Sequence, residues 1–476
     1  MKRSILSILL SGTVVMGLGA ARADVPPPPP AAPAAAPATA TKSTSATPAE
    51  RALEKLALSV QRRTLENGLR VVLNPDPHAP TVAVSVTYDV GSRHEAPGRS
   101  GFAHLFEHMM FQGSRHVKKG QHFGLIAERG GNLNGTTSSD RTNYFEVLPS
   151  SELELALWLE ADRMRWLDVS AENFENQRAV VKEEYRMRYQ NAPYALAALR
   201  LLELVFASYP PYANPTIGKI ADLDGAALAW VQEFYQSHYA PNNAVLTIAG
   251  GFDPDHALAL VDRFFGSIPS RPVAPFPAPP AALEGRAAKE TIEDANAKTP
   301  GLYYGWLIPP NHTPEHYALE LVAMLLGDGE SARLHQKLVR TRAIALDTRA
   351  YTRDFRGPDL FGVQIVLAER ATLPVVAREL DAELERLRKS PPSAAELARV
   401  KQRLESIFVF GLEATMNRAV ELGEYELFWG DARGLARELS HYQAVTAEQV
   451  QAAAARYLGP ERRVVLEVLP KAQVKP

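Results

Sequence analysis

His104-Leu-Phe-Glu-His108 is an H-x-x-E-H string, and it is the most informative stretch of this sequence. Side chains four residues apart lie on one face of a helix, so the two imidazoles can hold one metal ion. Glu107 lies on nearly the same face, where its carboxylate can reach a water molecule beside the metal without ligating the metal. The alternative is a helix with two surface histidines. The surrounding sequence favours a metal centre with Glu107 as general base.

Composition excludes several classes of function. The chain has 476 residues, 46% hydrophobic and 22% charged, which is typical of a globular protein with more than one domain. A net charge of −2 gives no electrostatic reason to expect binding to nucleic acid or to an anionic membrane. Because the chain has no cysteine, disulfides and thiolate metal sites are excluded, and a metal must be held by His and carboxylates.

The N-terminus has the pattern of a secretory signal. Lys2 and Arg3 precede an apolar stretch over residues 5–18, and Ala21-Arg22-Ala23 is typical of a cleavage site. We therefore predict a signal peptide over residues 1–23 and a bacterial periplasmic or secreted protein with no membrane span after signal removal. An uncleaved anchor is the alternative.

Proline-rich stretches divide the rest of the chain. Residues 24–55 are expected to be a disordered Pro/Ala-rich linker, and residues 269–288 a second linker. They separate an N-terminal domain over 56–268, which carries the H-x-x-E-H motif, from a C-terminal domain over 289–476, which does not. The halves resemble a diverged repeat, since one spacing occurs in both, at Val231, Pro241 and Val245 and again at Val450, Pro460 and Val464.

Local patterns predict the same elements in each half. Residues 64–73 form a predicted hairpin around Asn67-Gly68, followed by a strand over 81–88 and the motif helix over 101–111. In the second half, residues 301–308 are a predicted strand and 316–326 a helix. We expect an α+β fold of two homologous domains, each an antiparallel-rich sheet packed with helices.

A catalytic zinc site usually has three protein ligands, so one must come from elsewhere. The best segment is the predicted helix 174–188, for which Ser170 is a plausible N-cap. Glu184 shares a face with Phe174 and Val181, which should point inward. Glu183 shares a face with Val180 and Met187, so periodicity alone leaves both glutamates open.

Longer strings around these residues resemble the pitrilysin/insulinase family of zinc peptidases, which includes the mitochondrial processing peptidases. The likeness covers essentially the whole folded chain, about residues 60–470, and is closest to short bacterial members; it is most specific in residues 104–113, 174–188, 212–218 and 242–250. The resemblance implies Zn²⁺ held by His104, His108 and Glu184. It also implies that this chain forms one half of a peptidase clamshell.

Two positions depart from the family pattern. Gln177 stands where members often have a glutamate that orients a ligand, and an amide can still do so by hydrogen bonding. Arg340 matches an arginine that helps to bind substrate, but the tyrosine expected after it falls near Leu346-Asp347. Tyr351 is too far along to take its place. A partner subunit could supply the missing clamp.

The turn-rich stretch 130–144 reads as a surface loop by composition. The resemblance instead implies an edge strand to which an extended peptide adds, with Asn134, Gly135, Thr136 and Thr137 as binding candidates. The histidines outside the motif lack ligand spacing and are expected to be solvated; they are His78, His94, His116, His122, His238, His256, His312, His316, His335 and His441.

Two functions follow as hypotheses. The first is a zinc-dependent endopeptidase that hydrolyses peptides or unfolded polypeptides, with Glu107 activating the attacking water. It would work as a heterodimer with a clamp-bearing, non-catalytic subunit of the same family, or else as a homodimer. The alternative is a non-catalytic peptide-binding or assembly subunit of such a complex.

Overall fold

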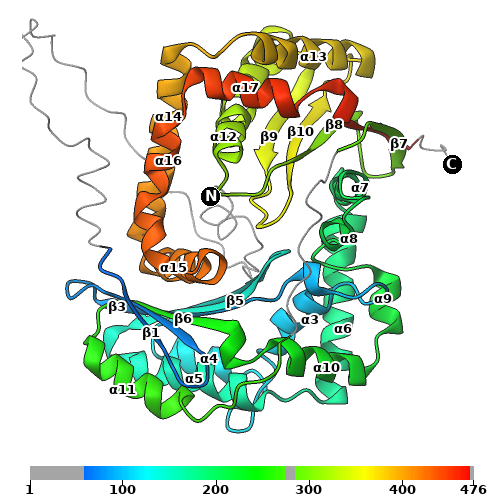
Figure 1. Ribbon diagram of the computed structural model, residues 1–476. Coiled ribbons are helices and arrows are strands. Elements are labelled where there is room, and N and C mark those ends of the chain that lie inside the picture. The colour runs from blue at the N-terminus through cyan, green and yellow to red at the C-terminus, as the bar shows by residue number, and fades with distance from the viewer. Residues whose placement is uncertain (1–57, 274–284, 472–476) are drawn as a thin grey trace, which may run out of the picture.

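A computed structural model describes residues 58–273 and 285–471. The predicted signal peptide, the 24–55 linker and the centre of the 269–288 linker lie outside these ranges. Within them the chain forms two sheets, each covered by helices, so the predicted α+β fold is confirmed (Figure 1).

The first sheet has six strands in the order β1-β2-β6-β3-β5-β4. The predicted hairpin is confirmed, because β1 and β2 pair antiparallel with Thr64 opposite Arg70. β2 and β6 are parallel, and the other neighbours are antiparallel. The strands are β1 Gln61–Thr64, β2 Arg70–Pro75, β3 Thr81–Tyr88, β4 Asn132–Thr137, β5 Thr142–Pro149 and β6 Ala244–Gly250.

The second sheet repeats this topology without the first hairpin strand. Its order is β7-β11-β8-β10-β9, with β7 and β11 parallel and the remaining pairs antiparallel. The strands are β7 Ala288–Asp294, β8 Gly301–Ile308, β9 Ala345–Thr352, β10 Asp359–Leu367 and β11 Val464–Pro470. Strand β8 thus takes the place of β3, and helix α12 (Pro314–Gly327) follows β8 as α3 (Phe102–Met109) follows β3.

Helices cover both sheets (Figure 1). Besides α3, the first half contributes α4 Gln121–Glu128, α5 Leu153–Trp166, α6 Ala171–Tyr185, α9 Ile220–Gly225, α10 Leu228–His238 and α11 Pro254–Phe265. The second half contributes α13 Leu373–Lys389, α14 Ala394–Glu413, α16 Glu438–Ala444 and α17 Ala447–Tyr457. Two further helices, α7 Ala195–Val205 and α15 Thr415–Trp429, connect the halves, as does the short α8 Pro210–Ala213.

The halves exchange helices. Helix α7 comes from the first half but packs on β8 and β11, whereas α15 comes from the second half and packs on β2, β3, β5 and β6. Small residues allow the close approach. Ala419 of α15 is buried against Ala83 and Ala249, and a Cβ on Gly305 of β8 would lie 2.7 Å from Val205 of α7. Each sheet is therefore covered in part by a helix from the other half of the chain.

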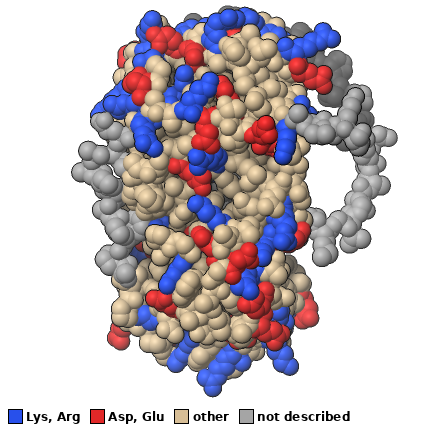
Figure 2. Space-filling view, turned by 90° about the vertical axis from the view of Figure 1, so that its right-hand side faces the viewer, with Lys and Arg blue, Asp and Glu red and all other residues tan. Residues whose placement is uncertain are grey.

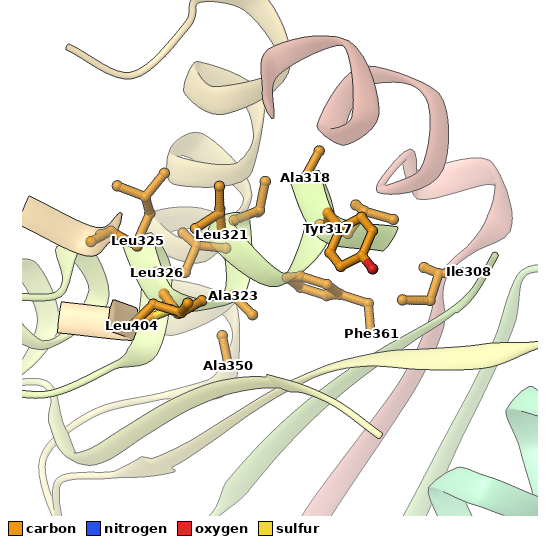
Figure 3. Close-up of a cluster of buried hydrophobic side chains, with 14 of the residues drawn as sticks. Ile308, Tyr317, Ala318, Leu321, Ala323, Leu325, Leu326, Ala350, Phe361 and Leu404 are labelled. Carbon is orange, nitrogen blue, oxygen red and sulfur yellow. The ribbon is translucent and has the colours of Figure 1, made fainter. Parts of the chain in front are cut away.

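The largest core cluster surrounds α12, which is buried on every side from His316 to Leu326. Figure 3 shows Ala318, Leu321 and Leu325 of this helix among side chains from neighbouring elements. On the face drawn in Figure 2, acidic and basic side chains are interspersed over both units. No helix in the described ranges is long and apolar enough to cross a membrane.

Candidate metal centre

The motif helix α3 is held at its N-terminus by an acidic side chain that precedes it. The N-cap, Gly101, has a left-handed φ of 91° and no side chain to cap the helix. Glu95 takes over that role, because its two carboxylate oxygens accept from the backbone N–H groups of Gly101 and Ala103, each at 2.9 Å. Burial raises the pKa of Glu95 to about 8, while these N–H groups act in the opposite direction.

Helix α6 brings an acidic side chain to α3. Ser170 caps it, as predicted, by accepting from the N–H of Asn173. Phe174 and Val181 are buried, so the face they share points inward and Glu184 with it. Glu183 is exposed and pairs with Arg186 at 2.9 Å. The structure therefore brings Glu184, and not Glu183, to the motif histidines.

The three side chains converge. Oε2 of Glu184 lies 3.6 Å from Nε2 of His104 and 3.3 Å from Nε2 of His108. Two ligand atoms at ~2.0–2.2 Å from a tetrahedral zinc ion are roughly 3.3–3.6 Å apart. Nε2 of His104 is the ring nitrogen that faces Glu184, while its Nδ1 is buried without a hydrogen-bond partner among the described residues. The residues present fit a zinc ion.

The electrostatics of the cluster also suit a cation. Burial raises the pKa of Glu184, but hydrogen bonding with His108 and the charges of His104 and Arg188 lower it more strongly, to about 2. Arg188 lies 2.8 Å from the other Glu184 oxygen. Burial lowers the pKa of His104, which favours the neutral, metal-binding imidazole. Gln177 is buried, and its Nε2 donates to Oδ1 of Asn176 at 2.7 Å.

Glu107 points at the edge strand β4. Its Oε2 accepts from the Thr137 hydroxyl at 2.6 Å, and a Cβ on Gly135 would lie 3.1 Å from its Cγ. Asn134 is exposed, whereas Thr136 is buried and held by Arg141 at 2.7 Å. In the described sheet β4 pairs only with β5, so its other edge is open beside Glu107.

The structure places Arg340 away from the metal centre and corrects one expectation about the histidines. Arg340 is exposed on η5 (His335–Thr341), which packs on β9 of the second sheet, so the structure does not bring it to the histidine cluster. The expectation that all other histidines are solvated is wrong, because His122 and His316 are 4% and 0% exposed. His122 shares the buried face of α4 with Ile126, and α12 is enclosed on all sides.

Sequence reasoning missed Glu95 and did not foresee the contact that Thr137 makes with Glu107. Glu95 lies six residues before the helix cap that it serves, so no local capping pattern reveals it. Thr137 was expected to bind substrate, but its hydrogen bond to Glu107 depends on how β4 packs against α3.

Known proteins resemble this chain over most of its length. A sequence model described as Insulinase (Peptidase family M16) matches residues 70–217, and one described as Peptidase M16 inactive domain matches residues 228–404. An uncharacterized zinc protease of Mycobacterium tuberculosis is 32% identical over 413 residues, covering 84% of this chain and 91% of the relative. The zinc protease PqqE of Helicobacter pylori is 28% identical over 380 residues, covering 78% and 84%.

Solved structures also share the fold of this chain. The crystal structure of a protease from Helicobacter pylori superposes with a TM-score of 0.82 at 26% identity, covering 87% of this chain and all (100%) of that one. The periplasmic protease PqqL from Escherichia coli shares the fold, with a TM-score of 0.70 at 19% identity; the match covers 87% of this chain but 48% of the larger protein. This chain belongs to the insulinase family of peptidases, family M16.

Proposed function

We propose that this chain is a zinc-dependent endopeptidase that hydrolyses peptides or unfolded polypeptides. The observation that carries the proposal is the convergence of Nε2 of His104, Nε2 of His108 and Oε2 of Glu184 at distances that suit a tetrahedral ion, with Glu107 beside them. Relatives named as zinc proteases support it.

His104, His108 and Glu184 would hold the zinc, and Gln177 would orient His108. When bound, zinc supplies a Lewis acid that polarises a carbonyl and makes water more acidic. Glu107 accepts the proton of the attacking water and then delivers it to the leaving amine. The hydroxyl of Thr137 holds the Glu107 carboxylate in place for both transfers.

The open edge of β4 would align the substrate. An extended peptide adds to such an edge through main-chain hydrogen bonds, which are independent of side-chain identity. Gly135 leaves room between strand and base, since a side chain there would meet Glu107, Tyr144 and Phe111. Asn134, being exposed on the same strand, is placed to contact substrate. This mode of binding suits unfolded chains rather than folded proteins.

The active form would contain more than one chain. The match to the Escherichia coli protease covers 48% of that protein, which is therefore about twice as long in a single chain. The tyrosine expected after Arg340 is replaced near Leu346-Asp347, so a clamp from another subunit would complete the substrate-binding face. We propose a heterodimer with a non-catalytic subunit of the family, with a homodimer as the runner-up, in the periplasm or outside the cell. Measuring mass in solution together with activity, alone and after mixing, tests this; a fully active monomer would contradict it.

A matched pair of variants tests the metal ligands. Glu184→Gln should lower the zinc content by one ion per chain and abolish peptide hydrolysis, because an amide is a poor zinc ligand. Glu183→Gln, at the exposed neighbour, should leave both unchanged. The opposite pattern would assign the ligand to Glu183. If neither variant alters zinc content, the alternative function, a non-catalytic binding subunit, is favoured.

A further inference from the structure

The connection between β4 and β5 lies where the two halves of the chain meet. It comprises residues 138–141 and directly follows Thr137, whose hydroxyl binds Glu107. Its last residue, Arg141, is 5% exposed and pairs with Glu424 of α15, with 2.7 Å between Nε and Oε1. Because α15 comes from the second half and lies on the first sheet (Figure 1), this buried ion pair joins the two halves.

The same guanidinium also binds β4. Nη1 of Arg141 donates to the backbone carbonyl oxygen of Thr136 at 3.1 Å and to the Thr136 hydroxyl at 2.7 Å. That hydroxyl donates in turn, at 2.6 Å, to Oδ1 of Asn143, which lies opposite Thr136 on β5. One side chain therefore links Glu424 of α15 to the residue next to Thr137. A buried, charge-assisted contact of this kind fixes geometry more strongly than an exposed ion pair does.

Asp140 makes a second connection between the halves. It is 4% exposed, and its Oδ1 lies 2.9 Å from Nη1 of Arg93 and accepts from the Tyr212 hydroxyl at 2.7 Å. Its Oδ2 accepts at 3.1 Å from the backbone N–H of Arg356, which lies between β9 and β10 of the second unit. The Tyr212 hydroxyl also accepts from the N–H of Gly357 at 2.8 Å. Both α15 and the connection between β9 and β10 thus hold the turn between β4 and β5.

We propose that the second half of the chain positions the edge strand β4 and the general base, with Arg141 and Glu424 as the positioning residues. This inference rests on the proposed peptidase function, in which Glu107 is the base and β4 aligns the substrate. Without the Glu424 carboxylate, the buried guanidinium no longer holds Thr136, so the Thr137 hydroxyl shifts relative to Glu107. The metal ligands lie on α3 and α6, which the printed contacts of Arg141 do not reach, so zinc binding should be unchanged.

Helix α15 offers a matched control. Glu426, two residues after Glu424, is 3% exposed and pairs with Arg62 of β1, with 2.7 Å between Oε2 and Nε. This ion pair also joins the two halves, but β1 lies at the opposite edge of the sheet from β4. Glu424→Gln and Glu426→Gln therefore remove the same kind of contact from the same helix, and only the first removes a contact that reaches β4.

Amide hydrogen exchange of the full chain reports on β4 whether or not the protein is active. In Glu424→Gln, residues 132–137 should exchange faster than in wild type, whereas Glu426→Gln should leave their exchange unchanged. In the peptidase assay, Glu424→Gln should lower kcat about tenfold or more with the zinc content unchanged, and Glu426→Gln should keep kcat within about twofold of wild type.

Thr137→Val separates positioning of the base from a general loss of stability. The contacts from Glu424 to Glu107 pass through Thr137, so adding Glu424→Gln to Thr137→Val should lower kcat by a smaller factor than Glu424→Gln does alone. Independent effects would instead multiply. If Glu424→Gln does not fold, Arg141→Lys takes its place with the same expected results, because lysine keeps the charge but lacks the fork that binds Glu424 and Thr136 together.

Three results would overturn the proposal: unchanged exchange of residues 132–137 in Glu424→Gln, equal loss of kcat in Glu424→Gln and Glu426→Gln, or fully multiplicative effects with Thr137→Val. A wild-type protein that hydrolyses no peptide would instead refute the proposed function. In that case the exchange comparison between Glu424→Gln and Glu426→Gln still decides whether the second half positions β4.

Discussion

The N-terminus of the motif helix depends on Glu95, and Glu95→Ala is the sharpest test of how the scaffold holds the site. The substitution removes both acceptors of the Gly101 and Ala103 N–H groups, which lie at 2.9 Å. Glu95 is only 8% exposed, so water does not readily replace it. His104 follows Ala103 directly, and the position of the first ligand therefore depends on this cap.

The expected cost follows from these contacts. A buried N–H group left without an acceptor costs about 1–3 kcal/mol, so two such groups cost roughly 2–6 kcal/mol of unfolding free energy. Glu95→Gln keeps the side-chain volume and one acceptor oxygen. It should cost roughly 1–3 kcal/mol, for the single N–H that then faces an amide N–H₂. The free energy of unfolding should therefore fall in the order wild type, Glu95→Gln, Glu95→Ala.

Urea unfolding of the chelator-treated proteins measures these differences without the stabilisation that bound metal adds. Zinc affinity, measured on the same variants, should fall in the same order, because a displaced α3 misplaces His104. The role of Glu95 would be refuted if Glu95→Ala stayed within about 0.5 kcal/mol of wild type in both stability and zinc affinity. That range is typical of surface substitutions.

Three further outcomes are expected. Thr137→Val should lower kcat about tenfold or more, because the charged Glu107 carboxylate loses a hydrogen bond. Thr137→Ser keeps the hydroxyl and should retain most of the wild-type kcat. Equal rates for the two variants would contradict the contact. Burial lowers the pKa of His94 to about 3, and its Nδ1 accepts from the Gly91 N–H. The unfolded chain therefore takes up a proton at this residue before the folded protein does, so the stability that is present above pH ~6.5 is lost as pH falls toward 3. The loss is at most about 1.4 kcal/mol per pH unit. His94→Asn, which keeps an acceptor but does not titrate, should flatten that slope in acid unfolding curves; an unchanged slope would assign the pH dependence to other groups. Ala419→Leu should cost about 1–3 kcal/mol by overpacking α15 against the first sheet, measured by thermal unfolding, and a neutral effect would contradict the close approach seen there.

Elements with a strong local pattern could be predicted from the sequence. The Asn67-Gly68 hairpin, the alternating strands β3 and β8 and the Ser170 cap of α6 each depend on neighbours in the chain. The repeat was visible for the same reason, and the structure shows it as one strand order used twice. The motif spacing likewise placed two histidines on one helix face.

What could not be predicted depends on packing between distant segments. Helical periodicity puts Glu183 and Glu184 on different faces and could not choose between them; the family resemblance pointed to Glu184, and the packing of α6 on α3 gives the physical reason. The exchange of α7 and α15 between the units has no sequence signal, since neither the apolar α7 nor α15, with its buried Arg418 and Glu421, indicates which sheet it will cover. Burial of His316 follows from the same packing around α12.

The central claim, that Glu107 is the base of a zinc peptidase, is tested most directly by Glu107→Gln. The amide keeps the shape of the side chain but cannot accept a proton from water. We expect the variant to bind as much zinc as wild type at His104, His108 and Glu184, while hydrolysis of a mixed peptide substrate falls by ~10²–10⁴ or more. Hydrolysis near the wild-type rate by the zinc-loaded variant, abolished by chelator, would contradict the assignment of Glu107.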